Sequence, residues 1–514
     1  MSTSSIPQHS LLVLFLITIG LSLGTFLQIL DTAIANVSIP NISGDLGVSP
    51  STGTWVITSF AISNAVVLPL TGWLSSLFGQ VRLFVWSTGL FTFVSFLCGI
   101  AWNFEVLLIF RIIQGAVAGC LIPISQGLLI NNYPENQKGL ALGFWAMIVV
   151  VAPVVGPVLG GYLTDNYGWP WIFFINVPIG ILSCFLVWKL LENEKVGKPL
   201  PVDYMGLLLI LIAVATLQIT LDKGQELDWF SSNFIRTTAI ISFLGFVYFC
   251  IWNYYSKYPI VNFQFFTSRN FNFSLLTCSF GFMVFFGTTV LLPLWLQTQQ
   301  GYTAFKAGVT VTPIAIMPVL LSPIVGKYMA HFDQRYLVSF SFFMFSMTFF
   351  WMSGLNTDVD IGHIIKIRLV QGLGLAFFFI PLIQIGLSEI PNKEISSSSG
   401  IYNFIRLTMG GGVGTSIYVT MWERREIYHR SILIDNLTPF DPTYQRAFEI
   451  AKDLGVSDIK AQAILERVLE QQSYLLAIND CFYFSAWLFL ALIPLIWLSK
   501  PIKRDIEKAV IASE

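Results

Sequence analysis

The chain has 514 residues, of which 55% are hydrophobic and only 11% are charged, and its formal net charge is −1. Soluble domains carry about 25% charged residues, so this composition excludes an ordinary water-soluble globule. The near-neutral charge gives no sign of a nucleic-acid partner, and none is expected. A lipid bilayer is the environment that such a chain requires.

Apolar windows long enough to cross a membrane recur along almost the whole sequence. About 20 residues of helix cover the roughly 30 Å of hydrocarbon in a bilayer. We therefore expect an all-α polytopic membrane protein with fourteen spans, which lie near residues 11–40, 54–74, 83–102, 106–130, 139–163, 171–191, 205–221, 237–256, 271–296, 307–329, 336–355, 361–389, 399–422 and 479–499. The first window lacks the basic leader and cleavage site of a secretory signal, so it is expected to be retained as a span.

The distribution of lysine and arginine predicts the orientation. With a cytoplasmic N-terminus, the inner loops and the C-terminal tail hold half of the 28 basic residues, whereas the short outer loops hold only Lys223, Arg236 and Lys306. Cytoplasmic loops are enriched in such residues. We expect both termini in the cytoplasm, segment 423–478 outside, and localisation in the inner (cytoplasmic) membrane.

The chain also contains an internal repeat. "RIIQG" from Arg111 recurs as "RLVQG" from Arg368, 257 residues later, and Gly72 and Gly326 lie 254 residues apart at the ends of corresponding spans. Duplicated halves are common in transporters, although a chance RxxQG pair is the alternative. We expect an N-terminal six-helix bundle at 1–198, an inserted two-helix segment at 199–258, and a C-terminal six-helix bundle at 259–514, with 423–478 as an extracytoplasmic helical loop.

Few ionisable residues lie deep in the predicted spans, and Asp31 is the only carboxylate well inside one. A charge at the bilayer centre costs roughly 2.5–3.5 kcal/mol even on the mild insertion scale, and such residues usually mark a pathway or a pair. At about 1.5 Å rise per residue, Asp31 and Arg111 lie roughly 10 Å and 8 Å below the outer ends of their helices. Their depths nearly match.

We therefore predict that Asp31 carries a proton and that Arg111 tunes it. Burial and a neighbouring cation act in opposite directions on the pKa of a carboxylate, which allows titration near neutrality. The alternative is a fixed ion pair that only orients the two helices. Asn36 and Ser38 extend a hydrophilic stripe on the same helix, and helix–helix hydrogen bonding explains Asn36 equally well.

Substrate-binding residues are harder to choose. The chain has 45 Phe, 15 Trp and 11 Met to line a cavity for cationic or neutral amphiphiles. Our candidates are Asn36, Gln114, Gln126, Trp145, Arg368 and Arg406. No acid lies at the position of the second half that corresponds to Asp31. Arg368 and Arg406 therefore have no predicted carboxylate partner, and we expect them to bind an anionic substrate group, water or backbone carbonyls.

The fifth span is rich in glycine and proline. Glycines permit close helix contact, and prolines bend a helix by removing backbone donors. We predict a conformational hinge here, formed by Pro153, Gly156, Pro157, Gly160 and Gly161. Tight packing alone is the alternative explanation.

The sequence of the outer segment, 423–478, predicts soluble helices. Asp441 is a candidate N-cap with Pro442 in the first helical position. From Ser457 onward, one helical face carries Ala461, Ile464, Leu465, Val468 and Leu469. That face is expected to pack on the outer surface of the protein itself or to bind a partner.

Four motifs together give a resemblance that covers nearly the whole chain: "LDTAIANVSIP" from Leu30, "RIIQGAVAG" from Arg111, "GPVLGGYLTD" from Gly156 and "WPWIFFINVPIG" from Trp169. They resemble the first-, fourth-, fifth- and sixth-helix signatures of the major facilitator superfamily, in its fourteen-span drug:proton antiporter (EmrB/QacA-like) branch. The chain departs from the usual pattern at Ser76 and Leu77, where the family has charged residues of a cytoplasmic latch, and at Pro170, where arginine is usual.

The resemblance implies a major facilitator fold and proton-coupled multidrug efflux by alternating access. The implied partners are protons, small hydrophobic or cationic drug-like substrates, and an EmrA-like periplasmic adaptor that leads to an outer-membrane channel. The adaptor is the partner that the apolar face of the outer segment would bind.

Other classes of function have less support. The sequence has no GxxxxGK[ST] motif for ATP, no CxxC pair among its six cysteines, and no HExxH among its four histidines. No cofactor or metal is therefore expected, and the protein is predicted not to be an enzyme. The alternatives are a proton-coupled transporter of a specific metabolite in either direction, a membrane-embedded acyltransferase, and a sensor that keeps the transporter fold.

Overall fold

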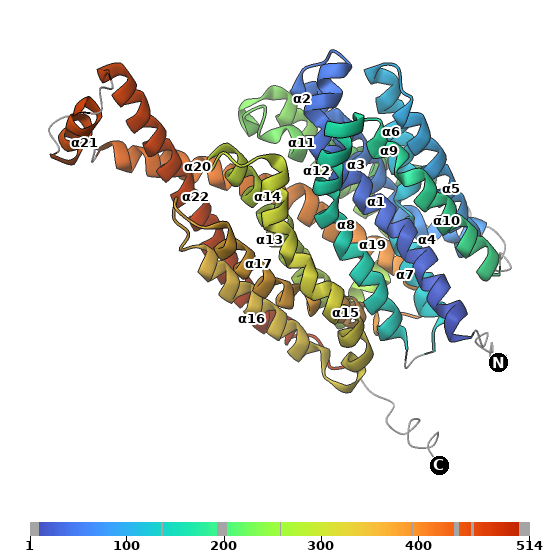
Figure 1. Cartoon of the computed structure of the whole chain (residues 1–514). Helices are drawn as coiled ribbons and strands as arrows, with labels where there is room; N and C mark the ends of the chain where they lie inside the picture. Colours follow the sequence, from blue (N-terminus) through green and yellow to red (C-terminus); the bar gives the residue numbers. More distant parts are fainter. Residues whose placement is uncertain are drawn as a thin grey trace.

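The computed structural model describes residues 10–134, 137–192, 203–257, 259–391, 394–435, 442–453 and 457–502. Within these ranges the regular structure is entirely helical (Figure 1). The predicted boundary between residues 198 and 199 falls outside the described residues, as does residue 258 beside the second boundary.

The first part of the chain forms the helices of the N-terminal half. These are α1 (Leu11–Asp45), α2 (Pro50–Gly53), α3 (Trp55–Val67), η1 (Leu68–Leu70), α4 (Thr71–Phe78), α5 (Gln80–Gly99), α6 (Phe104–Ala118), α7 (Leu121–Asn132), α8 (Lys138–Tyr167), α9 (Trp171–Phe174) and α10 (Asn176–Leu190). An inserted helix pair follows, with α11 (Tyr204–Gly224), η2 (Trp229–Ser231) and α12 (Asn233–Tyr255).

The remainder of the chain forms the C-terminal half and an outer extension. Its helices are η3 (Phe263–Thr267), α13 (Arg269–Thr298), α14 (Ala304–Val311), η4 (Thr312–Ala315), α15 (Ile316–Tyr328), η5 (Met329–His331), α16 (Gln334–Met352), α17 (Ile361–Ala376), α18 (Phe379–Leu387), α19 (Ile395–Leu407), the π-helical η7 (Thr408–Gly414), α20 (Thr415–Asp435), α21 (Pro442–Asp453) and α22 (Asp458–Ile496).

All fourteen predicted windows are helical. Among the described residues, eleven helices are long and apolar enough to cross a membrane, and the bent α8 makes a twelfth. The other two windows correspond to α16 and to the stack of α19, η7 and α20, which contains a run of four serines and Arg406. The chain is a multi-pass membrane protein, and fourteen spans are consistent with its helices although only twelve pass this test.

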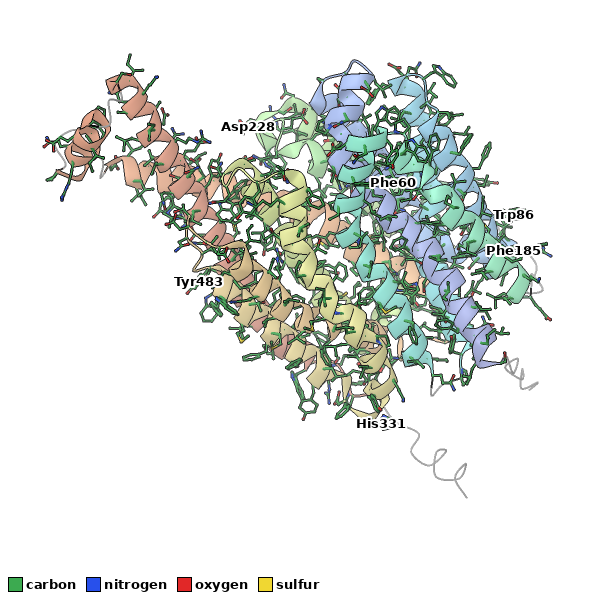
Figure 2. All side chains as sticks on the ribbon, in the orientation of Figure 1. Phe60, Trp86, Phe185, Asp228, His331 and Tyr483 are labelled. Atoms are coloured by element: carbon green, nitrogen blue, oxygen red, sulfur yellow. The ribbon has the colours of Figure 1, made fainter. Side chains whose placement is uncertain are left out.

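Large aromatic side chains face outward on the periphery of the bundle. Figure 2 shows Trp86, Phe185 and Tyr483 at its edges, and their exposed fractions are 58%, 49% and 51%. Phe60 lies in the interior and is 2% exposed. Much of the aromatic content is therefore available to lipid rather than to a substrate.

The two halves approach each other closely at the end of the bundle where α1 begins and α22 ends (Figure 1). A Cβ atom on Gly143 of α8 would lie 2.6 Å from the Ser322 oxygen of α15, and one on Gly400 of α19 would lie 2.6 Å from the Leu68 oxygen. Gly139 of α8 and Gly326 of α15 approach each other just as closely, backbone to backbone. Only glycine permits such close backbone contact, so glycines form the seal between the halves at this end.

The inserted pair contacts both halves at the opposite end. The Lys223 Nζ atom of α11 donates to Thr54 Oγ1 at 3.0 Å. On the other side, Ser416 Oγ of α20 donates to the Leu221 oxygen at 2.8 Å, and Trp229 Nε1 donates to Thr420 Oγ1 at 3.1 Å. Helix α11 runs a few residues beyond the predicted end at 221, so its outer turn reaches both halves.

The outer extension consists of the C-terminal part of α20, α21 and the N-terminal part of α22, and it projects beyond the bundle (Figure 1). The predicted N-cap Asp441 lies outside the described residues, and α21 begins at Pro442 as expected. On the predicted apolar face of α22, Ala461 is buried, but Ile464 and Val468 remain 53% and 48% exposed. The described residues therefore cover only part of this face.

Candidate proton and substrate site

Asp31 and Arg111 form an ion pair in the interior of the N-terminal half. Arg111 Nη1 of α6 donates to Asp31 Oδ2 of α1, and the two side chains are 0% and 1% exposed. The two residues of nearly matching depth are therefore in contact, and their role with the proton stays a prediction. Because a buried charge costs much free energy unless it is paired and hydrogen-bonded, this pairing explains how both ions are retained in an apolar bundle.

Two amides complete the surroundings of the carboxylate. Asn176 Nδ2 of α10 donates to Asp31 Oδ1 at 3.0 Å, and Gln114 Nε2 of α6 donates to the same oxygen at 3.2 Å. Asn176 also donates to Ser95 Oγ of α5 at 3.0 Å. Helices α1, α5, α6 and α10 thus meet at one carboxylate, which accepts three hydrogen bonds in all.

The guanidinium of Arg111 is held from several sides. Its Nε donates to the Val56 oxygen of α3 at 2.9 Å, and its Nη1 also donates to Gln114 Oε1 at 2.8 Å. Its Cζ lies 4.4 Å from the Phe60 ring centroid and 5.6 Å from that of Phe173, distances typical of cation–π contact. The ion pair is a built site and not a chance contact.

Sequence reasoning missed Asn176 and assigned Gln114 to the substrate. The structure places Gln114 against Asp31 and Arg111, and the RxxQ spacing on one helical face was the signal for this contact. Asn176 follows "WPWIFFI" as a lone amide in an apolar window. An amide there is equally compatible with ordinary helix packing, so the sequence carried no specific signal for it.

The two residues of the predicted hydrophilic stripe on α1 have different hydrogen-bond partners. Ser38 Oγ shares a 2.7 Å hydrogen bond with Thr164 Oγ1 of α8, so it joins two helices of the same half. Asn36 is exposed, and its amide donates to the Thr32 oxygen of its own helix at 3.1 Å. This hydrogen bond therefore joins no second helix.

Gln126 and Trp145 lie where the halves meet. The Oε1 atom of Gln126, on α7, accepts from Ser399 Oγ and, at 3.0 Å, from Asn403 Nδ2 of α19. The Trp145 ring of α8 stacks on Phe379 of α18 with centroids 5.8 Å apart. Both predicted substrate candidates thus contact the opposite half, although each is almost fully buried.

The two arginines of the second half have no carboxylate partner among the described residues. Arg368 Nη1 donates to Gln371 Oε1 at 2.6 Å, within α17. Arg406 Nη2 donates to Asn403 Oδ1 at 2.5 Å, within α19. Arg368 and Gln371 repeat the spacing of Arg111 and Gln114, but the second half lacks the acid.

The predicted hinge coincides with a bend. Helix α8 turns by 43° between its segments Lys138–Pro153 and Val155–Tyr167. A Cβ atom on Gly156 would lie 2.5 Å from Ala33 Cβ, and one on Gly160 would lie 3.0 Å from the Ile34 oxygen, so both pack on α1. A Cβ atom on Gly161 would meet nothing within 4 Å. Pro157 lacks the backbone donor that would otherwise bond across the bend.

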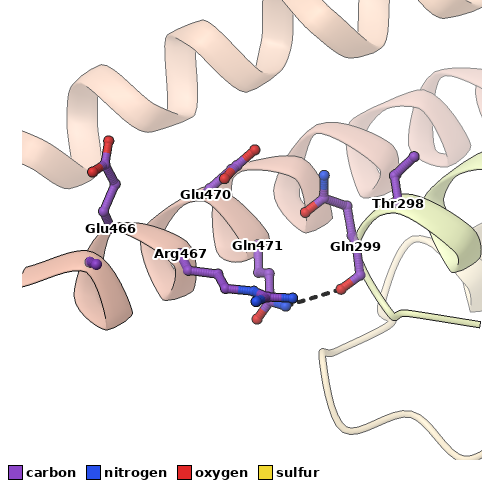
Figure 3. A pocket seen from close by; sticks show the side chains of 7 residues that line it. Thr298, Gln299, Glu466, Arg467, Glu470 and Gln471 are labelled. Carbon is purple, nitrogen blue, oxygen red and sulfur yellow. Dashed lines mark hydrogen bonds between the residues drawn. The ribbon is translucent and has the colours of Figure 1, made fainter. Parts of the chain in front are cut away.

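A polar pocket of about 380 Å³ lies on the outer extension, away from the ion pair (Figure 3). Its wall includes Thr298, Gln299, Glu466, Arg467, Glu470 and Gln471. Gln471 Nε2 donates to the Gln299 oxygen at 3.0 Å. This polar surface differs from the aromatic cavity predicted for the substrate.

Metal-binding chemistry finds no support in the described part of the chain, where no group of three or more His, Cys, Asp or Glu is placed to hold an ion. All six cysteines are free.

Comparisons with known proteins agree with this architecture. Residues 21–415 match the Major Facilitator Superfamily. The chain is 44% identical to the fatty acid resistance protein FarB of Neisseria gonorrhoeae, over 94% of this chain and 96% of the relative. It is 45% identical to the multidrug export protein EmrB of Haemophilus influenzae, over 95% and 96%.

A solved structure, the fucose:proton symporter FucP of Escherichia coli, superposes with a TM-score of 0.57 at 12% identity, covering 94% of this chain and 98% of the symporter. At that identity the likeness concerns the fold alone.

Proposed function

The chain belongs to the Major Facilitator Superfamily, and from that premise we propose that it is a proton-coupled exporter of hydrophobic and amphiphilic compounds that works by alternating access. It is a secondary transporter rather than an enzyme, because its relatives over nearly the full length are transporters. The acyltransferase alternative is thereby set aside.

One observation carries the proposal: a buried carboxylate that is held by three donors from side chains of two other helices. Asp31 is 2% exposed, yet Arg111, Gln114 and Asn176 all donate to it. A proton on Asp31 would cancel its charge and replace charge-assisted bonds by weaker neutral ones. The packing of α1, α6 and α10 is therefore sensitive to a single proton.

The cycle that follows uses this sensitivity. Asp31 takes up a proton from the outside, and the weakened pair permits the halves to open toward the cytoplasm. There a substrate enters and the proton leaves to the cytoplasm, which restores the carboxylate and its bonds. The restored pair favours the conformation with the inner glycine seal closed, from which the substrate leaves outward. Each charge moved across the membrane contributes about 2.3 kcal/mol per 100 mV.

We assign roles to the other predicted site residues from their positions in the structure. We assign Gln114 and Asn176 to the proton site with Asp31 and Arg111. Gln126, Trp145 and Arg406, which lie at or beside the contact between halves, are assigned to the substrate path. The bend at Pro153, Gly156 and Pro157 is the proposed hinge, with Gly160 as its packing contact to α1. Asn36 and Gly161 keep only their predicted roles, whereas Arg368, whose hydrogen bond stays within α17, is given no role in substrate binding.

The substrate class rests on the relatives. One is named for multidrug export and another for fatty acid resistance. Hydrophobic or cationic drug-like molecules are the proposed substrates, and a proton-coupled transporter of one metabolite is the second candidate.

The remaining proposals concern the surroundings of the protein. We place the chain in the inner membrane with both termini in the cytoplasm, and we divide it at 1–198, 199–258 and 259–514.

The half-exposed Ile464 and Val468 on α22 favour a periplasmic adaptor as the partner of the extension, and this adaptor would lead to an outer-membrane channel.

The test is transport in proteoliposomes. With an imposed pH gradient, the wild-type protein should move ethidium against its concentration gradient, and Asp31→Asn should not. Asparagine retains an acceptor for Arg111 but leaves its buried charge uncompensated, so the folding of Asp31→Asn is verified by size-exclusion chromatography before transport is compared. Equal transport by both proteins would refute the assignment of Asp31.

A further inference from the structure

Arg406 is a buried cation without an anionic partner among the described residues. It is 4% exposed, its Nη2 donates to Asn403 Oδ1, and its Nε atom has no acceptor within the described chain. Arg111, buried to a similar degree in the other half, is paired with Asp31. An unpaired buried charge is costly, so a guanidinium in this position calls for an acceptor that the described residues do not supply.

Aromatic rings enclose this guanidinium. Its Cζ lies 4.2 Å from the Phe282 ring centroid of α13 and 4.6 Å from that of Phe379 of α18. Trp145 of α8 stacks on Phe379. The rings offset part of the cost through cation–π attraction, but a ring face cannot satisfy the in-plane N–H groups of the guanidinium. They do provide an apolar wall beside the charge.

A second unused donor lies next to it. Asn403, which accepts from Arg406, donates to Gln126 Oε1 across the interface at 3.0 Å. The Nε2 atom of Gln126 is buried and has no acceptor among the described residues. The region therefore has an excess of N–H donors and one positive charge, contributed by both halves of the protein.

The position of Arg406, Asn403 and Gln126 in the fold is relevant to transport. The adjacent contacts of Gly400 with Leu68 and of Gly127 with Ser396 join the halves within two turns of Arg406 and Gln126. These contacts belong to the glycine seal at the end of the bundle where α1 begins. Arg406 thus lies directly beside the seal, where a ligand would be enclosed when the seal closes and admitted when it opens.

We propose that Arg406 binds the carboxylate of an acidic amphiphile, whose apolar body lies against Phe282, Phe379 and Trp145. A planar guanidinium pairs with a carboxylate through two parallel hydrogen bonds, and Arg406 retains a free donor for this purpose. The inference rests on the proposed export function and specifies one substrate class for it. Arg368 also has unpaired buried donors, but its partner Gln371, unlike Asn403, makes no hydrogen bond to the other half among the described residues.

The experiment compares two fluorescent probes that differ only in the headgroup. These are 11-(dansylamino)undecanoate and the undecylamine of the same length with the same dansyl group. Their binding to the full chain in nanodiscs is measured for the wild type, Arg406→Gln, Arg406→Lys and Arg368→Gln. We expect the wild type to bind the carboxylate about tenfold more tightly than the amine, as one charge-assisted pair allows.

Arg406→Gln should lose this preference, Arg406→Lys should lose part of it because an ammonium cannot form the two parallel bonds, and Arg368→Gln should keep it. No preference in the wild type, or an unchanged preference in Arg406→Gln, would overturn the inference. Equal loss in Arg368→Gln would do so too, because the effect would then not be local. If Arg406→Gln does not fold, Arg406→Lys decides, and an unchanged preference in that variant would overturn the inference.

Chloride is the competing source of negative charge. Replacing chloride with methanesulfonate, which carries no carboxylate, should leave the carboxylate preference intact or increase it. If the preference exists only without chloride, Arg406 holds chloride and the inference is wrong. Ethidium transport by the wild type is measured in parallel: transport without a carboxylate preference refutes only this inference, and absence of transport refutes the proposed function.

Discussion

At the scale of single residues, the decisive feature is that three side chains donate to one buried carboxylate. The three side chains have different roles: Arg111 neutralises the charge of Asp31, whereas Gln114 and Asn176 orient its carboxylate. Asn176 is the contribution of α10, and it links the carboxylate to Ser95 of α5. A change at Asn176 should therefore alter the function of Asp31 without removing any charge.

We predict that Asn176→Leu is expressed and folded but exports ethidium roughly tenfold more slowly, since a hydrogen bond to a charged group contributes about 1.5–3 kcal/mol. Initial rates in proteoliposomes measure the effect. Asn166→Leu is the matched control, because Asn166 is an exposed amide that bonds only its own helix, at the Tyr162 oxygen. Equal slowing in both variants would indicate that Asn176 has no special role.

The sequence predicted the ion pair but not its amides. Charge inside an apolar window is rare, so Asp31 and Arg111 stand out and their depths can be calculated from the helix rise. Asn176, Gln126 and Asn403 are neutral amides, which occur at many helix contacts. Their partners depend on how helices far apart in the sequence are rotated, and a single sequence does not specify that rotation.

At the scale of elements, the contact between α8 and α15 depends on two glycines. Gly139 and Gly326 approach so closely that any side chain at either position would collide with the opposite backbone. We predict that Gly326→Ala separates the two helices at the end of the bundle where α1 begins, because overpacking typically costs about 1–3 kcal/mol.

A spin-label distance between cysteines introduced at Lys138 and Lys327 should be longer in Gly326→Ala than in the parent. Gly44→Ala, whose added Cβ atom meets nothing within 4 Å, should leave the distance unchanged. An unaltered distance in Gly326→Ala would mean that this contact does not seal the end of the bundle where α1 begins.

The outer extension has a pH-dependent element of its own. Burial raises the pKa of the Glu426 carboxyl on α20 above its ordinary value, with Arg430 opposing and Glu470 adding to the shift. In the window above that ordinary value the folded extension binds more protons than the unfolded one, so its stability falls as pH rises. The packing of α20 on α22 should weaken accordingly.

Hydrogen exchange of α20, corrected for the intrinsic rate, should be slower at pH 5 than at pH 8 in the wild type. Glu426→Gln should abolish most of that difference, whereas Glu449→Gln, at an exposed glutamate of α21, should retain it. A full pH effect in Glu426→Gln would assign it to another group.

At the scale of the whole molecule, the inserted pair links the halves at the end opposite the glycine seal. Lys223 bonds Thr54 of the first half, and Trp229 bonds Thr420 of the second. Asp228 and Trp229 have positive φ angles of 57° and 49°, which are strained for residues with side chains. Their turn is therefore held in place by these contacts.

We predict that Trp229→Phe, which removes the indole donor, broadens the distance distribution between labels on α3 and α20. Trp252→Phe should not, because the Trp252 indole bonds Asp203 within the inserted pair. If the two variants give the same distribution, the inserted pair does not restrain the halves.

The overall architecture was largely predictable, because windows of 20 apolar residues are a strong signal and all fourteen became helical. The difference in the number of spans arises at α16 and at the serine-rich α19, where polar residues lower the apolarity of helices that still lie in the bundle. The role of α11 could not be foreseen, since a link between two halves depends on tertiary contacts and leaves no periodic pattern.

The central claim is that substrate and proton exchange through Asp31. It is tested most directly by measuring proton release from the purified protein in weakly buffered detergent when tetraphenylphosphonium or ethidium is added. We expect the wild type to release protons and Asp31→Asn to release none while still binding the substrate. Proton release from Asp31→Asn equal to that of the wild type would contradict the account, because the coupling group would then lie elsewhere.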